Sequence, residues 1–172
     1  EETLGDERVL DIRYSEPKKV FWILGQHSIS SFNTTNNAFK KTQIEVEPTS
    51  FAILGDKIMV GTSNGYLEIN PETGKTIGEV HNKLPVPAIT CMETIDGQLW
   101  FGSAQGAYKL KDDGKFDYYY GKRWLPGNVV EHISKGPDGS ILILTDAGLG
   151  KIDFKKMTLA DKAEYYEQQV RN

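Results

Sequence analysis

The sequence predicts an all-β fold, β-propeller-like, with about four blades of three to four antiparallel strands and a C-terminal α-helix. Two observations carry this prediction: short apolar runs recur between turn residues, and a glycine-containing turn returns at a nearly constant spacing. Gly65, Gly106 and Gly148 lie 41 and 42 residues apart. A period near 40 residues with β character is typical of propeller blades.

Three segments carry the repeat clearly, namely Ile58–Asn70, Leu99–Leu110 and Ile141–Asp153. Each reads as a strand, a turn of small residues and a second strand. A weaker copy, Val20–Asn33, lies upstream and lacks the second glycine of the turn. The sequence therefore indicates four units, of which the first is the least regular.

Further strands flank each copy. A first apolar strand is expected at 9–12, 50–53, 88–92 and 129–133, and a turn rich in Pro, Asp and Gly follows each of them. Such turns have a physical cause, since Pro pre-sets φ and Gly tolerates positive φ. A fourth strand is expected at 41–46, 75–80 and 116–120. The last copy has no such strand.

These units divide residues 7–154 into blades at approximately 7–47, 48–87, 88–128 and 129–154. Residues 155–172 read as a helix. Thr158 can act as its N-cap with Asp161 three residues on, and apolar residues at spacings of four, three and four form one face. They are Leu159, Ala163, Tyr166 and Val170. We expect this helix to be either a cap or the start of a following domain.

Composition excludes several classes of function. The formal net charge is −4, which disfavours general nucleic-acid binding because that needs a basic face. No run of 18 apolar residues exists, so no membrane insertion is expected. The single cysteine, Cys91, sits in an apolar run and is expected to be a buried small hydrophobe.

No catalytic residue, metal site or cofactor is predicted. The three histidines, His27, His81 and His132, do not form a recognised zinc-binding spacing. Neither a P-loop, a Rossmann fingerprint nor a G-x-S-x-G elbow occurs. The aspartates beside glycines are best explained by turn chemistry.

The segment 118–128 is the most distinctive in the chain, because it combines tyrosines, two cations, a Trp and turn residues between two copies. Such connections line the ligand face of propellers. Trp and Tyr can stack on sugar rings, and Arg can pair with a carboxylate. Candidate ligand-binding residues are therefore Arg123, Trp124, Tyr119 and Lys122, together with His27. The alternative is that Trp124 and its neighbours only plug the space between blades.

Asn33 begins an Asn-Thr-Thr sequence, which matches the pattern for N-glycosylation. Short sequons also arise by chance, so this is a weak candidate modification site.

Residues Asp96–Gly106 resemble the two-component-regulator propeller repeat, and Gly61–Gly65 resembles its second half. The sequence departs from that repeat where Asp and Gly are contiguous and where Ser103 and Ala107 replace Thr and Leu. The resemblance covers about residues 7–154 and implies an extracellular or periplasmic sensor or binding domain. It also implies a ring of six or seven blades, more than the four units present.

Three functions remain open at this stage. The first is a sensor-like module that binds a small-molecule or glycan ligand or a protein partner, without catalytic activity of its own. The second is the N-terminal propeller part of a larger secreted enzyme acting on polysaccharide. The third is a structural module that completes a ring with another chain, or contacts further domains of a longer one.

Overall fold

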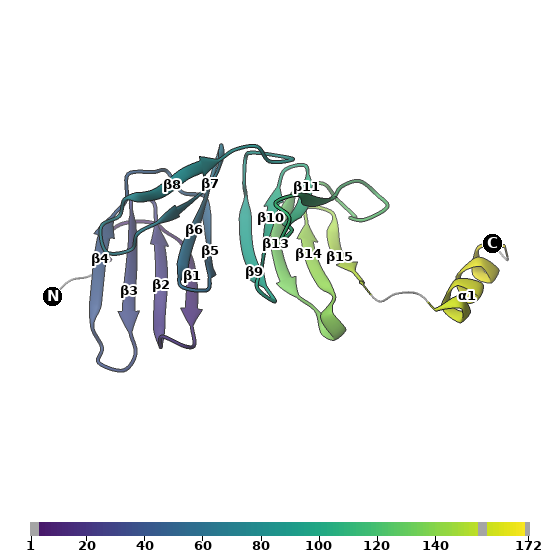
Figure 1. Cartoon of the computed structure of the whole chain (residues 1–172), viewed down its shortest axis with the longest axis horizontal. Helices are drawn as coiled ribbons and strands as arrows, with labels where there is room; N and C mark the ends of the chain where they lie inside the picture. The colour runs from purple at the N-terminus through teal and green to yellow at the C-terminus, as the bar shows by residue number, and fades with distance from the viewer. Residues whose placement is uncertain (1–3, 155–157, 171–172) are drawn as a thin grey trace.

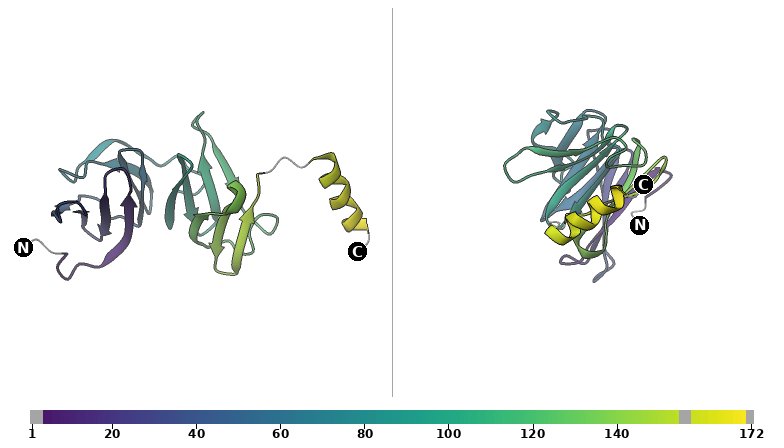
Figure 2. Two further views of the ribbon diagram at one scale, coloured as in Figure 1. Left: turned by 90° about the horizontal axis from the view of Figure 1, so that it is seen from below. Right: turned by 90° about the vertical axis from the view of Figure 1, so that its right-hand side faces the viewer.

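The computed structural model describes residues 4–154 and 158–170 and shows four antiparallel sheets in a four-blade β-propeller arrangement, followed by one short helix (Figure 1). This confirms the predicted fold class. The sheets lie side by side in chain order, and the helix stands apart from them (Figures 1 and 2).

Blades 1 and 2 have four strands each, hydrogen-bonded in sequence order. Blade 1 contains β1 (Val9–Ser15), β2 (Val20–Gly25), β3 (Ser28–Asn33) and β4 (Phe39–Gln43). Blade 2 contains β5 (Ser50–Leu54), β6 (Lys57–Thr62), β7 (Gly65–Ile69) and β8 (Thr76–His81).

Blade 3 also has four strands, whereas blade 4 has three. Blade 3 contains β9 (Cys91–Ile95), β10 (Gln98–Ser103), β11 (Gly106–Leu110) and β12 (Phe116–Tyr119). Blade 4 contains β13 (Val130–Lys135), a short 3-10 helix η1 (Pro137–Gly139), β14 (Ile141–Thr145) and β15 (Gly148–Ile152), and the helix α1 (Leu159–Val170) follows.

The first strand of blade 3 begins later than the 88–92 expected from the sequence. Residues 87–89 are held by blade 2 instead, because Ile89 N–H donates to the Thr62 carbonyl (3.0 Å) and Pro87 O accepts from Gly65 N–H (2.7 Å). The apolar run at 88–92 is therefore partly a connection that crosses between blades, and its hydrophobicity reflects burial rather than strand pairing.

The turn between the second and third strands is the same in blades 2, 3 and 4. The hydroxyls of Thr62, Ser103 and Thr145 each donate to the carbonyl of the glycine three residues on, at 2.9, 2.8 and 2.8 Å. A Cβ on Gly65 or Gly106 would collide with a carbonyl oxygen of the neighbouring strand. A close backbone approach thus requires glycine at these two positions, whereas at Gly148 the positive φ of +135° favours it.

Blade 1 builds this turn differently. Gly25 stands where the hydroxyl residue would be, and a Cβ there would collide with the Glu7 carboxylate. That carboxylate accepts hydrogen bonds from His27 N–H (2.5 Å) and Ser28 Oγ (2.7 Å), and it pairs with Lys41 Nζ (2.8 Å). A carboxylate just before the first strand of the blade therefore replaces the missing hydroxyl.

Three hydrophobic clusters hold consecutive blades together. The cluster between blades 1 and 2 contains Leu24, Ile29, Ile44, Phe51, Ile58, Val60, Leu67 and Ile69. The cluster between blades 2 and 3 contains Ala52, Met59, Tyr66, Ile89, Met92, Leu99, Phe101 and Tyr108. The cluster between blades 3 and 4 contains Ile95, Trp100, Ala107, Tyr119, Leu125, Val130, Ile133, Ile141, Ile143 and Ile152.

Near the propeller axis, one arginine ties blade 1 to blade 3. Arg13 in β1 donates from Nη2 to the Met92 carbonyl (2.6 Å) and pairs with the Glu93 carboxylate, both in β9. Its own strand supplies a second carboxylate, Asp11, at 3.1 Å. This link joins blade 1 directly to blade 3 across blade 2.

Candidate functional site

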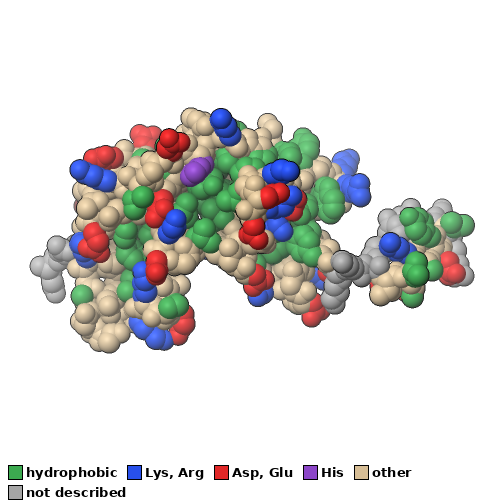
Figure 3. Space-filling model, viewed as in Figure 1, with side chains coloured by type: hydrophobic (Ala, Val, Ile, Leu, Met, Phe, Trp, Pro, Cys, Tyr) green, Lys and Arg blue, Asp and Glu red, His purple; other side chains and the backbone are tan. Residues whose placement is uncertain are grey.

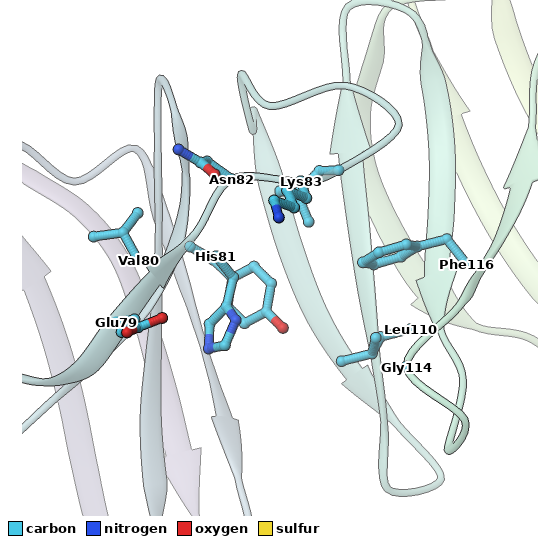
Figure 4. Close-up of a pocket in the computed structure, with 10 residues that line it drawn as sticks. Glu79, Val80, His81, Asn82, Lys83, Leu110, Gly114 and Phe116 are labelled. Atoms are coloured by element: carbon cyan, nitrogen blue, oxygen red, sulfur yellow. The ribbon is translucent and has the colours of Figure 1, made fainter.

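A groove with a volume of about 520 Å³ lies between blades 2 and 3 (Figure 4). Its walls come from β8 and the residues after it on one side, and from β11 and β12 on the other. The side chains that line it include Glu79, His81, Lys83, Leu110 and Phe116. A second hollow of about 420 Å³ shares Tyr66, Glu79, His81 and Leu110, so the two form one elongated groove.

A bulge in β8 opens this groove. Tyr66 in β7 pairs with His81, whereas Glu68, two residues later in β7, pairs with Ile77. The stretch of β8 between the two pairs is therefore four residues long, against two residues in β7. Gly78 lies in the extra stretch with φ of +71°. All six residues of β8 are exposed. Bulges bend a strand and re-aim its side chains, and here the bulge turns Glu79 and His81 into the groove.

The floor of the groove on the blade 2 side is aromatic. The Tyr66 ring stacks on His81 with centroids 4.7 Å apart, and it contacts Phe101 of blade 3 at 4.9 Å. Tyr66 is only 6% exposed. Burial raises the pKa of Tyr66, so its phenol stays protonated at neutral pH and offers a neutral hydroxyl to the groove.

The opposite wall is fixed by edge-to-face aromatic packing. The Phe116 ring meets Tyr108 at 5.5 Å with an interplanar angle of 87°. The Tyr108 hydroxyl donates to the Val86 carbonyl (2.6 Å) in the connection from blade 2. Burial raises the pKa of Tyr108 as well. This wall is therefore preorganised, and it presents apolar carbon to the open space.

Charged groups stand around this apolar interior. Glu79 and Lys83 reach the groove from opposite ends of the same segment, with His81 between them (Figure 4). On the surface, apolar side chains gather in the hollow between the two halves of the molecule, with a histidine beside them (Figure 3). An apolar cleft with a few converging polar groups is the usual character of a ligand site.

The structure brings three of the sequence-predicted residues together. Trp124 meets Tyr119 edge to face at 5.2 Å, and Arg123 lies over the Trp124 ring with its Cζ 5.2 Å from the centroid. Tyr119 is 8% exposed and stacks on Trp100 as part of the core between blades 3 and 4. Trp124 is 40% exposed, and Lys122 lies in the same turn.

The other predicted positions lie elsewhere. His27 occupies the β2–β3 turn of blade 1, two blades away from Arg123, and its N–H binds Glu7. Asn33 ends β3, and its side-chain oxygen accepts from the backbone N–H of Thr35 (2.8 Å) in an Asx turn.

The groove was not predicted from the sequence, because none of the residues that line it stands out in the sequence by itself. The usable signal was Gly78 inside the strand expected at 75–80, since an interior glycine suggests a bulge. That bulge brings His81 to Tyr66, while Phe116 arrives from a different blade.

Two further findings concern only the described parts of the chain. Within residues 4–154 and 158–170, no three His, Cys, Asp or Glu side chains come together in a group that could bind a metal ion. The helices in that range are too short or too polar to cross a membrane.

Comparison with known proteins shows the fold without a family. Neither a protein-family model nor a curated protein sequence matches the chain. A luciferin-regenerating enzyme superimposes with a TM-score of 0.67 at 10% identity, over 88% of this chain and 57% of the other. A gluconolactonase from Xanthomonas campestris gives 0.65 at 14% identity, over 87% of this chain and 58% of the other.

The extracellular domain of a protein described as a one-component system from B. thetaiotaomicron also matches, over 87% of this chain and 28% of the other. Its TM-score is 0.43 at 16% identity. The chain thus spans little more than half of the two enzymes and a smaller part of that extracellular domain. At these identities the likeness to the two enzymes shows the propeller fold alone.

Proposed function

We propose that this chain is a sensor-like binding module that acts outside the cytoplasm, and that the groove between blades 2 and 3 holds its ligand. The groove itself carries the proposal, because a bulge opens it and rigid aromatic packing shapes it. The resemblance of Asp96–Gly106 to the repeat of extracytoplasmic sensors supports the location.

The ligand class that suits this groove is a short oligosaccharide. The groove is elongated and open, and it combines ring faces with groups that can hydrogen-bond hydroxyls. Phe116 and His81 can lie against the flat apolar face of a sugar ring, while Glu79 accepts and Lys83 donates hydrogen bonds.

Isothermal titration with a panel of neutral tetra- to hexasaccharides tests the proposal. We expect at least one to bind, and we expect His81→Ala and Phe116→Ala each to weaken binding by about tenfold, the cost of about 1.4 kcal/mol of lost contact. Deleting Glu79 and Val80 restores the regular β7–β8 register and should abolish binding.

Arg123→Ala and Trp124→Ala are the matched controls, because they alter the other aromatic and cationic surface. Binding that survives the groove variants but is lost in these two would move the site to the β12–β13 connection. No binding by any member of the panel would contradict the glycan proposal.

A further inference from the structure

A row of aromatic side chains leads away from the groove along the outer strand of blade 3. Phe116, Tyr118 and Tyr120 occupy every second position of β12 and of the residue that follows it. Side chains two residues apart point to the same side of a strand. Tyr108 pairs with Tyr118 and packs in the cluster between blades 2 and 3, so this side is the one that faces blade 2. The row therefore starts at the groove wall, which Phe116 forms, and continues beyond it.

Ring contacts make this row continuous with the groove. The Tyr108 ring meets Phe116 edge to face at 5.5 Å and Tyr118 edge to face at 6.4 Å. Tyr118 in turn stacks on Tyr120, with ring centroids 6.0 Å apart and an interplanar angle of 22°. We call Tyr118 and Tyr120 the tyrosine extension. The groove wall and the tyrosine extension thus form one aromatic surface.

The tyrosine extension is open to solvent, yet its rings are held in place. Tyr118 is 42% exposed and Tyr120 is 49% exposed. The Tyr118 hydroxyl donates a hydrogen bond to the Gln105 carbonyl. Both side chains pack over Gly106, where an added Cβ would lie 3.2 Å from Tyr120 Cβ and 3.3 Å from Tyr118 Cε2. A ligand would therefore meet rigid rings, and little side-chain freedom would be lost when it binds.

The tyrosine extension carries no charge. Asp117 and Tyr119 alternate with it and belong to the other side of the strand, where Asp117 pairs with Lys109 (3.8 Å) and Tyr119 packs in the core between blades 3 and 4. Burial raises the pKa of Tyr118, so its hydroxyl is neutral at pH 7. A charged ligand would find no countercharge on these two residues. A neutral sugar can place its C–H groups against the rings and its hydroxyls against the phenol oxygens.

From these observations we infer that the glycan bound in the groove is part of a longer chain, and that the tyrosine extension binds the sugar residues that leave the groove past Phe116. This inference rests on the proposed function, because it assumes that the groove holds a neutral oligosaccharide. A sugar residue tethered to one already bound reaches the tyrosine extension without a second loss of translational freedom. Affinity therefore rises with chain length until the tyrosine extension is filled.

Isothermal titration of the full chain with malto-, xylo- and manno-oligosaccharides of two lengths tests this. In a series that binds, we expect the decasaccharide to bind at least about tenfold more tightly than the tetrasaccharide. Tyr118→Ala and Tyr120→Ala should each weaken decasaccharide binding about fivefold and change tetrasaccharide binding by less than about twofold. Phe116→Ala should weaken the binding of both lengths, because Phe116 lines the groove itself.

Tyr14→Ala is the matched control. Tyr14 is also a half-exposed tyrosine, at 41%, and it also packs on a neighbouring ring, that of Phe21, at 4.6 Å. It lies in blade 1, away from the groove, so this substitution should change the binding of neither length. Circular dichroism checks that each variant folds.

The outcomes separate this inference from the proposed function. Equal affinity for both lengths, or decasaccharide binding that Tyr118→Ala and Tyr120→Ala leave unchanged, would overturn the inference and leave the groove as the site of a short ligand. An equal loss of tetrasaccharide binding in these two variants would also overturn it, because the tyrosines would then belong to the site of the short ligand. Binding of no member of any series would overturn the inference together with the proposed glycan.

Discussion

In the β2–β3 turn of blade 1, the Glu7 carboxylate takes the place of the side-chain hydroxyl that the equivalent turns of blades 2, 3 and 4 use. Burial of the carboxylate opposes its ionisation. Hydrogen bonds from Lys41, Ser28 and the His27 N–H outweigh that cost and lower the pKa of Glu7 to about 2. Its side chain is 12% exposed, so water screens these bonds only weakly. The degenerate turn of blade 1 therefore depends on a charge rather than on a hydroxyl.

This predicts a particular loss of stability in acid. The pKa of Glu7 is lower in the folded chain, about 2 against an ordinary 4.5, so its contribution is complete above pH 4.5 and disappears as the pH falls toward 2. Glu7→Gln should lower the free energy of unfolding at pH 7 by about 2 kcal/mol. It should also flatten the dependence of stability on pH in that window, as measured by urea unfolding.

Glu16→Gln is the matched control, because the Glu16–Lys19 pair lies on the exposed β1–β2 turn. We expect it to change stability by less than about 0.5 kcal/mol. An equal loss in both variants would mean that the Glu7 network contributes nothing specific.

Gly102 and Leu144 occupy the same register position in consecutive blades, yet they meet different surroundings. A Cβ on Gly102 would collide with Cys91 Sγ and Val130 Cγ1, whereas Leu144 is 41% exposed. Gly102→Ala should therefore cost about 1–3 kcal/mol through overpacking. Leu144→Ala should cost less than about 1 kcal/mol in dilute solution. Thermal unfolding that ranks the two variants in the opposite order would contradict this account.

At the scale of elements, β8 and α1 depart most from the common pattern. β8 was expected as a plain strand at 75–80, and it is instead bulged over Thr76–His81 because Gly78 permits positive φ. α1 begins as predicted: Thr158 and Asp161 exchange hydrogen bonds in a capping box, with Asp161 N–H donating to Thr158 Oγ1 (3.2 Å). These backbone and side-chain bonds from Thr158 lower the pKa of Asp161.

The exposure of α1 leads to a prediction at this scale. Its apolar residues Leu159, Tyr166 and Val170 are 87%, 65% and 86% exposed, so the helix gains little from packing. Isolated helices of 12 residues are marginal in water. Ending the chain after Phe154 should leave the melting temperature unchanged within about 1 °C. Calorimetry that shows a drop of several degrees would mean that the helix contributes to the stability of the blades.

At the scale of the whole molecule, similar apolar interfaces join consecutive blades. Within the described chain, the outer faces of blades 1 and 4 have no neighbouring blade. Consecutive blades share large apolar clusters, and Arg13 adds a tie from blade 1 to blade 3. Because each interface resembles the next, stability should be distributed along the arc, as in other repeat proteins. The two ends are where this regularity leaves apolar surface in water.

The sequence by itself was sufficient for the repeat and the fold class. Gly65 and Gly106 lie in turns whose close backbone contacts leave no room for a Cβ, and Gly148 has a positive φ of +135° that favours glycine. Such local constraints leave a visible period in the sequence. That no fourth strand follows β15 among the described residues could also be predicted, because the sequence there has a helical pattern.

Only the tertiary structure decided where the groove between blades 2 and 3 lies and which apolar faces stay uncovered. Tyr66, His81 and Phe116 come from different strands and blades, and no local pattern links them. Likewise, Phe21 and Ile58 are both apolar strand residues, but one is 37% exposed and the other 2%. Burial depends on what packs against a face, and that depends on contacts between residues far apart in the chain.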